Sequence, residues 1–254
     1  MYGTFPDLIS SYLYLFGSWE PDATQYLYSA LRNGGIFVDI GANIGYFTLT
    51  AATILGRSGR VIAIEPSTVS FDALTINIAA NKNLADVRCL KVAAGALAGE
   101  AMIYEAPPFN RGMTTMVPGW LHSGKSATPV APLTELLKDE EIKHVRLIKI
   151  DVEGSEPEVL KGLLGLVDKL PQDAEILVEV CPLRWPSAQH TLRDMFDPFI
   201  QKGFNIYRLQ NDALLFRMLW PEVGRMPRRI RKLPARNTFL VCELILSRRD
   251  VEVL

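Results

Sequence analysis

FVDIGANIGYFT, residues 37–48, contains a short apolar run, a glycine turn and the first residues of an apolar helix. The helical pattern continues over Tyr46–Leu55 and stops at Gly56. Such a turn places glycine backbone and a helix N-terminus at the end of a buried strand, where a ligand can approach the backbone closely. The segment therefore predicts a ligand-binding turn in an α/β fold.

A second apolar run supplies a carboxylate near this turn. The run Val61–Ile64 ends in Glu65 and Pro66, about twenty residues beyond the glycines. An acid at this position of an α/β unit accepts hydrogen bonds from the two hydroxyl groups of a ribose. The turn and the acid together predict a cofactor that contains a nucleoside.

The glycine spacing separates two kinds of nucleoside cofactor. A dinucleotide site has the pattern Gly-x-Gly-x-x-Gly, whereas here the glycines are Gly41 and Gly45, with Asn43 in place of the middle one. Asp39 comes first in the turn, where its charge would repel a pyrophosphate and could hold a cationic amino acid group. S-adenosylmethionine carries an ammonium, a sulfonium and a ribose but no phosphate, so the pattern favours this cofactor. The alternative is an ordinary strand–turn–helix unit whose glycines serve packing.

Length, composition and charge agree with one enzyme-sized domain. The chain has 254 residues, 48% of them hydrophobic, and a formal net charge of −1. A chain of this size and apolar content can bury a large core as one unit. The balanced charge gives no overall attraction to nucleic acid, so we do not expect a nucleic acid partner.

The cysteines and the N-terminal segment bear on the cellular compartment. Cys89, Cys181 and Cys242 have no CxxC spacing, so we expect neither a zinc site nor a disulfide framework, and we expect a reducing, cytoplasmic environment. Met1–Gly17 lacks a basic start and a long apolar core, which predicts a packed helix rather than a signal peptide. No segment has the roughly twenty uninterrupted apolar residues of a membrane span.

Apolar runs and amphipathic segments alternate along the chain. The expected strands are Ile36–Ile40, Val61–Glu65, Val87–Val92, Val145–Ile150, Glu175–Val180, Phe204–Leu209 and Thr238–Ser247. The expected helices are Tyr46–Leu55, Ser70–Ala80, Leu133–Lys138, Glu156–Leu170 and Ala188–Lys202. This alternation predicts a mostly parallel sheet covered on both faces, closed at its edge by an antiparallel hairpin of the last two strands. Two more strands, Glu100–Glu105 and Gly112–Val117, are expected in an insertion after the third strand.

The fold class that follows is α/β, a Rossmann-like sheet of seven strands with helices on both faces. We expect one domain over residues 1–254. It is divided into an N-terminal helical cap at 1–33, a cofactor-binding core at 34–182 and an acceptor-side region at 183–254.

Several motifs together resemble one protein family. They are WEP at 19–21, VDIGANIG at 38–45, IEP at 64–66, Asn77 with Asn81, AAG at 93–95, NRGMTT at 110–115, IKIDVEGSE at 148–156 and LVEV at 177–180. Over residues 12–182 the chain resembles the FkbM family of class I S-adenosylmethionine-dependent methyltransferases. The resemblance implies the class I methyltransferase fold. It also implies O-methylation of a hydroxyl group on a sugar, a lipid-like molecule or a secondary metabolite.

The resemblance also assigns cofactor-binding residues. They are Glu20, Asp39, Gly41, Ala42, Asn43, Gly45, Glu65, Pro66, Ala93 and Asp151. The turn residues would line the methionine end, Glu65 would take the ribose and Ala93 would border the adenine. Other roles stay open, because Asp39 could cap the following helix, Ala93 could pack in the core and Glu20 could only precede the turn at Pro21.

Three carboxylates near the ends of two expected strands are the catalytic candidates. A sulfonium methyl group is already activated, so the protein mainly aligns an acceptor oxygen, and a general base removes the proton of an alcohol. Ligands of open α/β sheets bind beyond the carboxyl ends of the strands, which points to Asp151, Glu153 and Glu179. Asp151 is the first candidate for the base or for positioning the acceptor. Alternatively, Asp151 caps the helix that starts near Ser155, with Glu153 favouring the helix dipole, or it pairs with Lys149.

No metal site is predicted. His122, His144 and His190 are isolated in the sequence, and each is more typical of surface or packing positions than of catalysis. No set of Asp, Glu and His has a spacing that demands a metal, although Asp151 and Glu179 could join one.

A basic stretch lies between the last two expected strands. It contains Arg225, Arg228, Arg229, Arg231, Lys232 and Arg236 and follows an apolar run at 214–220. As a loop over the acceptor side it could attract an anionic or lipid-linked acceptor, a carrier protein, an anionic membrane surface or nucleic acid, or it could be a solvated charged loop. The apolar run favours a hydrophobic or lipid-like acceptor, and peripheral membrane contact would involve residues 214–236.

Two other function classes fit the same fold. An RNA methyltransferase would bind RNA in a salt-sensitive manner, but the chain lacks overall positive charge and an appended RNA-binding domain. A non-catalytic protein would bind S-adenosylmethionine without turnover. A nicotinamide dehydrogenase is disfavoured by the glycine spacing.

Overall fold

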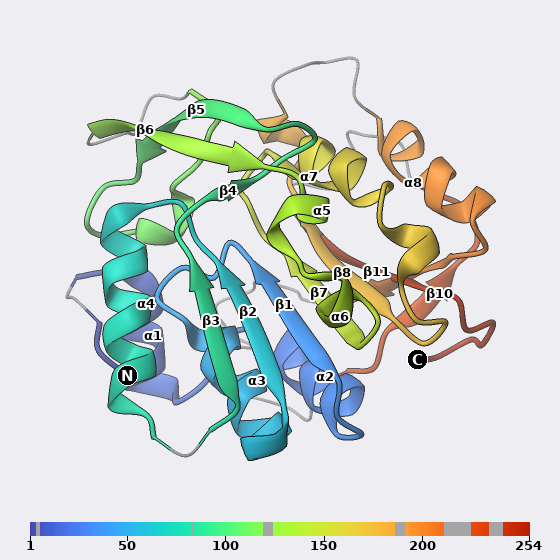
Figure 1. The fold of residues 1–254 in the computed structure, drawn as a ribbon, viewed down its shortest axis with the longest axis horizontal. Coiled ribbons are helices and arrows are strands. Elements are labelled where there is room, and N and C mark those ends of the chain that lie inside the picture. The colour runs from blue at the N-terminus through green and yellow to red at the C-terminus, as the bar shows by residue number, and fades with distance from the viewer. Residues whose placement is uncertain (4–5, 83, 119–123, 186–190, 211–224, 234–240) are drawn as a thin grey trace.

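One eight-stranded sheet forms the centre of the molecule (Figure 1). The structure is a computed structural model that describes residues 1–3, 6–82, 84–118, 124–185, 191–210, 225–233 and 241–254. In spatial order the strands are β10 (Arg228–Ile230), β9 (Asn205–Leu209), β11 (Cys242–Ser247), β8 (Glu175–Val180), β7 (Val145–Ile150), β1 (Ile36–Ile40), β2 (Arg60–Ile64) and β3 (Asp86–Leu90). The pairs from β8 to β3 are parallel, whereas β11 and β10 run antiparallel to their neighbours.

Helices cover both faces of this sheet. Every residue of β1 is buried, as expected for a strand packed on two sides. On the face of Phe37 lie α2 (Pro21–Leu31), α3 (Tyr46–Leu55) and α4 (Thr68–Ala80). On the opposite face lie α5 (Leu133–Leu136), α6 (Asp139–Ile142), α7 (Glu156–Leu163) and α8 (Leu192–Gln201). The predicted Rossmann-like α/β class with a mostly parallel sheet is confirmed.

A small second sheet lies beyond the carboxyl ends of β1–β3 (Figure 1). Its strands are β4 (Ala93–Ala94), β6 (Gly124–Ala131) and β5 (Gly99–Glu105). The remaining elements are α1 (Leu8–Phe16) and the short 3₁₀ turns η1 (Gly56–Ser58), η2 (Arg111–Met113), η3 (Val167–Lys169) and η4 (Pro182–Arg184). None of the described helices is long and apolar enough to cross a membrane.

The prediction of seven strands is wrong by one, because part of the basic stretch is a strand. Arg228–Ile230 pairs with the open edge of β9 as β10. Arg229 forms an ion pair with Asp250, which lies on the chain after β11. Arg236 and the apolar run at 214–220 lie outside the described residues.

The prediction of the C-terminal hairpin is correct for the pairing of its strands but wrong for its position in the sheet. Strand β11 pairs antiparallel with β9, as predicted. It inserts between β9 and β8 instead of closing the edge, so both of its sides are hydrogen-bonded. Its observed start is Cys242, and most of the predicted earlier part, at 238–240, lies outside the described residues.

The insertion and two helices differ from expectation. Gly112–Val117 is not a strand: it overlaps η2 and makes one isolated bridge, in which the backbone of Thr115 pairs with Tyr104 while its hydroxyl donates to the carbonyl of Glu153. The strand that pairs with β5 is β6. Most side chains of β6 are exposed, so its sequence has no alternation of apolar and polar residues that would predict a strand. The long helix predicted over Glu156–Leu170 ends at Leu163 and is followed by a turn and η3. The helix predicted over Leu133–Lys138 is a single turn, α5.

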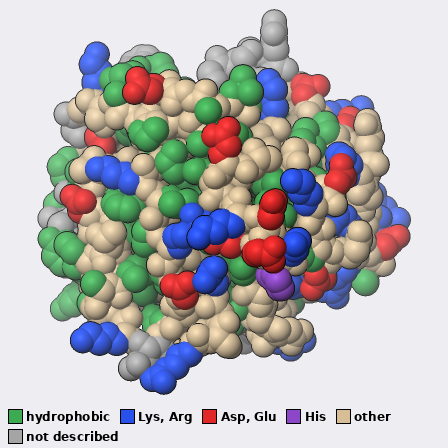
Figure 2. Space-filling view, viewed as in Figure 1, with side chains coloured by type: hydrophobic (Ala, Val, Ile, Leu, Met, Phe, Trp, Pro, Cys, Tyr) green, Lys and Arg blue, Asp and Glu red, His purple; other side chains and the backbone are tan. Residues whose placement is uncertain are grey.

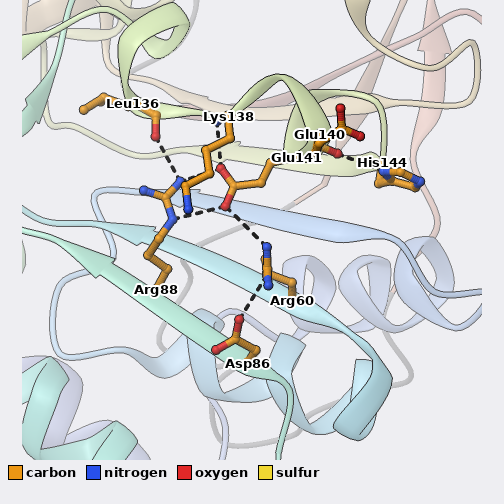
Figure 3. A network of polar contacts seen from close by, with 8 residues as sticks. All are labelled: Arg60, Asp86, Arg88, Leu136, Lys138, Glu140, Glu141 and His144. Carbon is orange, nitrogen blue, oxygen red and sulfur yellow. Dashed lines mark hydrogen bonds and ion pairs between the residues drawn. The ribbon is translucent and has the colours of Figure 1, made fainter.

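A network of ion pairs and hydrogen bonds connects α6 to β2 and β3 at the edge of the sheet (Figure 3). The buried carboxylate of Glu141 accepts hydrogen bonds from Nη2 of Arg88 at 2.6 Å and from the backbone N–H of Lys138 at 2.8 Å. Nη1 of Arg60 lies 3.7 Å from Glu141, and Nε of Arg60 donates to the exposed Asp86 at 3.0 Å. Figure 2 shows basic and acidic side chains next to each other near the middle of this face. The network therefore combines one buried acceptor with a surface pair.

Replacing the buried member of this network should cost far more stability than replacing the exposed one. We expect Glu141→Ala to lower the free energy of unfolding by about 2–3 kcal/mol, because it leaves Arg88 and a backbone N–H without their acceptor. Asp86→Ala, the matched control at a side chain that is 65% exposed, should cost less than about 0.5 kcal/mol. Urea denaturation measures both values, and equal losses would contradict this account.

Candidate functional site

The glycine turn brings the ends of β1 and β7 into contact. The backbone N–H of Asp151 donates to the carbonyl of Ile40 at 3.0 Å. A Cβ added to Gly41 would lie 1.8 Å from the carbonyl oxygen of Asp151, and Gly41 has a φ of 83°. Glycine is therefore required at this position for the two strands to end side by side.

Glu65 ties the turn to the end of β2. Its Oε2 accepts a hydrogen bond from the backbone N–H of Asn43 at 2.8 Å, and its Oε1 accepts one from Ser67 at 2.9 Å. Burial raises the pKa of Glu65 to about 7, against the two hydrogen bonds, which lower it. Each carboxylate oxygen has two lone pairs, so both oxygens retain an acceptor position for a further donor.

A cavity of about 470 Å³ opens over this turn. Its volume lies in the range of small-molecule and cofactor sites. The predicted site residues that line it are Glu20, Gly41, Ala42, Asn43, Glu65, Pro66, Ala93, Asp151, Glu153 and Glu179. Asp39 and Gly45 do not line it. Gly45 begins α3, and a Cβ added there would lie 2.7 Å from Leu74 of α4, so this glycine serves helix packing.

Asp39 directly precedes Ile40, which lines the cavity, but does not line it itself. Its carboxylate is buried, and Oδ2 accepts a hydrogen bond from the hydroxyl of Thr48 in the first turn of α3 at 2.6 Å. Burial raises the pKa of Asp39, while Lys149 and Thr48 lower it. Asp39 thus contacts the first turn of α3 through Thr48 but does not cap the helix, whose N-cap is Gly45 without a side-chain cap hydrogen bond.

Lys149 is the buried cation of the site. Its Nζ donates to Oδ2 of Asp151 at 2.8 Å and lies 4.5 Å from the centre of the Phe47 ring. Burial alone would lower the pKa of Lys149, but the carboxylates of Asp151, Glu20 and Asp39 outweigh burial and raise it. Asp151 is thus held by Lys149, and the N-cap of α7 is Ser155.

Five carboxylates, which we name the carboxylate cluster, gather at one side of the cavity. They are Glu20, Asp151, Glu153, Glu179 and Glu243. Two overlapping groups of three, one with Glu243 and one with Asp151, share Glu179, and within each group the oxygens lie within 4.8 Å of one another. Burial, followed by neighbouring carboxylates, raises the pKa of Glu179 well above its usual value.

Sequence reasoning missed Glu243. It lies directly opposite Glu179 in the antiparallel pair of β11 and β8, so the two side chains point to the same face. Placing Glu243 required knowing that β11 inserts beside β8. The signal present in the sequence was a lone acid in an apolar strand, Cys242–Ser247, which normally excludes unpaired charge.

Arg184 and a backbone network hold the loop after β7. Arg184 forms an ion pair with Glu153, whose pKa is raised to about 8 by burial, then by Asp151, with Arg184 opposing. Glu156 accepts from the backbone N–H of Gly154 at 2.7 Å and from the indole of Trp185 at 2.9 Å. These contacts fix a loop whose carboxylates face the cavity.

Backbone strain is concentrated at the cavity. The described non-glycine residues with positive φ are Glu20 at 43°, Asn43 at 50° and Glu153 at 53°, and all three line it. Non-glycine residues rarely adopt this conformation, and when they do they cluster at ligand sites, where the surrounding contacts hold them. This signal was not readable from the sequence.

The other sequence candidates lie elsewhere or outside the description. His144 is exposed, and its Nδ1 lies 2.9 Å from the carbonyl of Glu140, away from the cavity. His122 and His190 lie outside the described residues. In the basic stretch, Arg225 Nη1 donates to Gln210 at 2.9 Å, and Arg231 pairs with Glu252.

The chain was compared with known proteins. It matches the family model of the methyltransferase FkbM domain over residues 39–206. Methyltransferase sdnD of Sordaria araneosa is 28% identical over 208 residues, covering 70% of this chain and 76% of that protein. Hexuronic acid methyltransferase AglP of Haloferax volcanii is 29% identical over 151 residues, covering 59% of each chain. A solved rRNA methylase structure from Streptococcus thermophilus overlaps with a TM-score of 0.45 at 8% identity, covering 89% of this chain and 93% of that one.

The fold and the cavity define a Rossmann-like α/β protein with a ligand site at the carboxyl ends of its parallel strands. The chain belongs to the FkbM methyltransferase family, and the resemblance found in the motifs is confirmed.

The raised carboxylate pKa values predict how stability depends on pH. In the folded chain the pKa of Glu20, Glu65 and Glu156 is about 7 and that of Glu153 is about 8, against 4.5 for an unperturbed glutamate. The folded state therefore binds more protons than the unfolded state between these values, so stability is highest near the lower value and falls as pH rises.

We expect the melting temperature of the ligand-free protein to be lower at about pH 8 than at about pH 6, by at least about 4 °C. Differential scanning calorimetry in buffers of matched ionic strength measures the shift. A melting temperature that rises across this range would contradict the raised pKa values that burial gives these carboxyl groups.

Proposed function

We propose that the chain transfers a methyl group from S-adenosylmethionine to a hydroxyl group of a sugar, lipid-like or secondary-metabolite acceptor. The observation that carries the proposal is the cavity over the Gly41 turn, whose lining residues include acceptor oxygens without a donor. Asn43 Oδ1 and Glu20 Oε2 are buried and have no hydrogen-bond partner among the described residues. Ammonium and ribose hydroxyl groups are donors, so this wall fits the cofactor.

Each part of the cofactor has a counterpart in the cavity wall. Glu65 would accept hydrogen bonds from the ribose hydroxyls through the lone pairs that its backbone contacts leave open. The small side chains of Ala93 and Ala94 would leave room for the flat adenine ring. Asp151 would face the ammonium group, and Glu20 would add negative charge to the same cavity, since opposite charges attract strongly in a buried site.

The cofactor supplies an activated methyl group on a positively charged sulfur. The protein's part is to hold the acceptor oxygen in line and to take up its proton as the new carbon–oxygen bond forms. Asp151, Glu153 and Glu179 lie together at the cavity and provide carboxylate oxygens for that proton. Raised pKa values at Glu153 and Glu179 strengthen them as bases once they are ionised.

The cavity wall and one relative support the acceptor class. Leu8, Ile9, Met113, Met116 and Val241 contribute apolar surface to the cavity, which suits an acceptor with an apolar part. AglP is named for a hexuronic acid, which supports a sugar-type acceptor. We propose a cytoplasmic site of action, in keeping with three cysteines that form no disulfide.

Glu65→Ala tests the cofactor site. We expect at least a tenfold loss of affinity for S-adenosylhomocysteine, because charge-assisted hydrogen bonds of about 1.5–3 kcal/mol are removed. The matched control is Glu105→Ala, whose carboxylate accepts from the same Ser67 at 2.9 Å but does not line the cavity. Isothermal titration calorimetry measures both variants, and unchanged affinity in Glu65→Ala would count against the assignment.

The acceptor is found with labelled cofactor. We expect the purified chain to transfer a labelled methyl group to a small, ribonuclease-resistant component of an extract of the producing cell, which mass spectrometry then identifies. Label in ribonuclease-sensitive material would favour the RNA alternative. Binding of the cofactor without label in any fraction would favour the non-catalytic one.

A further inference from the structure

Two glutamates face each other across β8 and β11, and one of them, Glu179, lines the cavity. Glu179 and Glu243 are register partners on the same face of the sheet, where Cβ atoms of opposite residues lie about 4.5–5.5 Å apart. Like charges directly opposite each other destabilise a sheet. Glu20, at the N-terminus of α2, adds a third carboxylate within 4.8 Å of both. Such an arrangement needs positive charge.

Lys149 attracts the Glu243 carboxylate, but burial and the charge of Glu20 oppose this attraction and raise the pKa of Glu243. Its side chain is 2% exposed, and its Oε2 has no hydrogen-bond partner among the described residues. Oε2 of Glu20 is in the same state. Lys149 donates a hydrogen bond to Asp151, and Arg184 pairs with Glu153, so both of these cations are bound to other members of the carboxylate cluster. A buried acceptor without a donor indicates a missing partner.

We infer that Glu20, Glu179 and Glu243 bind a divalent metal cation. Three oxygens that are at most 4.8 Å apart always have a common point within about 2.8 Å of all of them, so small side-chain rotations reach the 2.3–2.6 Å of calcium–oxygen bonds. An all-carboxylate set selects Mg²⁺, Mn²⁺ or Ca²⁺ over metals that prefer sulfur or imidazole. Waters complete the coordination of such ions.

The position of this site gives the ion a function. Glu20 and Glu179 line the cavity, whereas Glu243 lies behind them, so a cation between the three is reachable from the cavity. A metal-bound hydroxyl group loses its proton at lower pH than a free one. The cation would thus bind the acceptor oxygen and ease transfer of its proton to a neighbouring carboxylate. This role rests on the proposed methyl transfer, but binding of the cation does not.

Manganese binding to the full chain tests the inference. We expect chelator-treated protein at about pH 7.5 to bind roughly one Mn²⁺ per chain, detected by electron paramagnetic resonance and calorimetry. Glu243→Gln should weaken binding at least tenfold and abolish the rise in melting temperature that Mn²⁺ causes. Glu20→Gln, at the other oxygen without a partner, is the second variant. It should also weaken binding if Glu243→Gln fails to fold.

The matched control is Glu175→Gln, a buried glutamate on the same strand as Glu179. Its two carboxylate oxygens accept hydrogen bonds from Tyr26 at 2.7 Å and Ser247 at 2.9 Å, whereas Oε2 of Glu243 has no partner among the described residues. This variant should keep its Mn²⁺ affinity within about twofold. The metal-free Glu243→Gln protein should be at least as stable as the unmodified chain, because the change removes a like-charge contact.

Two results would overturn the inference. One is the absence of Mn²⁺ binding at millimolar concentration, which would mean that a proton shared between Glu20 and Glu243 relieves their repulsion. The other is binding that survives both variants, which would place the ion elsewhere. S-adenosylhomocysteine is titrated into the same preparations. If S-adenosylhomocysteine binds while Mn²⁺ does not, the metal inference fails and the proposed function stands. If Mn²⁺ binds while S-adenosylhomocysteine does not, the proposed function fails and the metal inference stands.

Discussion

The buried ammonium group of Lys149 is the interaction on which the arrangement of this site depends. Lys149 is the register partner of Asp39 on β1, and its Nζ is hydrogen-bonded to Asp151 at the end of its own strand. Parallel strands that end at one edge bring their terminal side chains together, and here those side chains are acids. Without a cation among them, the energy of burying several carboxylates would prevent the strands from ending in register. Lys149 lies among these carboxylates and allows the strands to end in register.

Backbone geometry adds a second constraint to this electrostatic one. Gly41 lets β1 approach the carbonyl of Asp151, and Glu65 holds the turn through the backbone N–H of Asn43. The strained φ values at Asn43 and Glu153 persist because such contacts over-determine the loops. The protein thus maintains an ordered site at a cost in stability, as is common where ligand contacts must be in place before binding.

The sequence predicted the central strands and the turn well, because these carry their information locally. Ile36–Ile40 is apolar throughout and is followed by glycines, so its burial and its end are both readable. Arg228–Ile230 became a strand only because β9 offers an open edge, and β6 pairs without an apolar alternation. Glu243 entered the site through the placement of β11 between β8 and β9, which is a long-range property of the sheet. Local patterns cannot encode such pairings.

The charge balance of the site restricts what can bind there. The carboxylate cluster holds five acids, while Lys149 and Arg184 supply two cations, so full ionisation would leave an excess of negative charge in a mostly buried region. Proton uptake relieves that excess in the free protein, which is why burial and mutual repulsion raise the pKa of Glu179 and Glu243. A positively charged ligand relieves it in another way, by stabilising the ionised carboxylates and releasing the protons. Binding of a cation and ionisation of the catalytic candidates are therefore coupled, so a ligand that brings positive charge would also generate the bases that an acceptor hydroxyl needs.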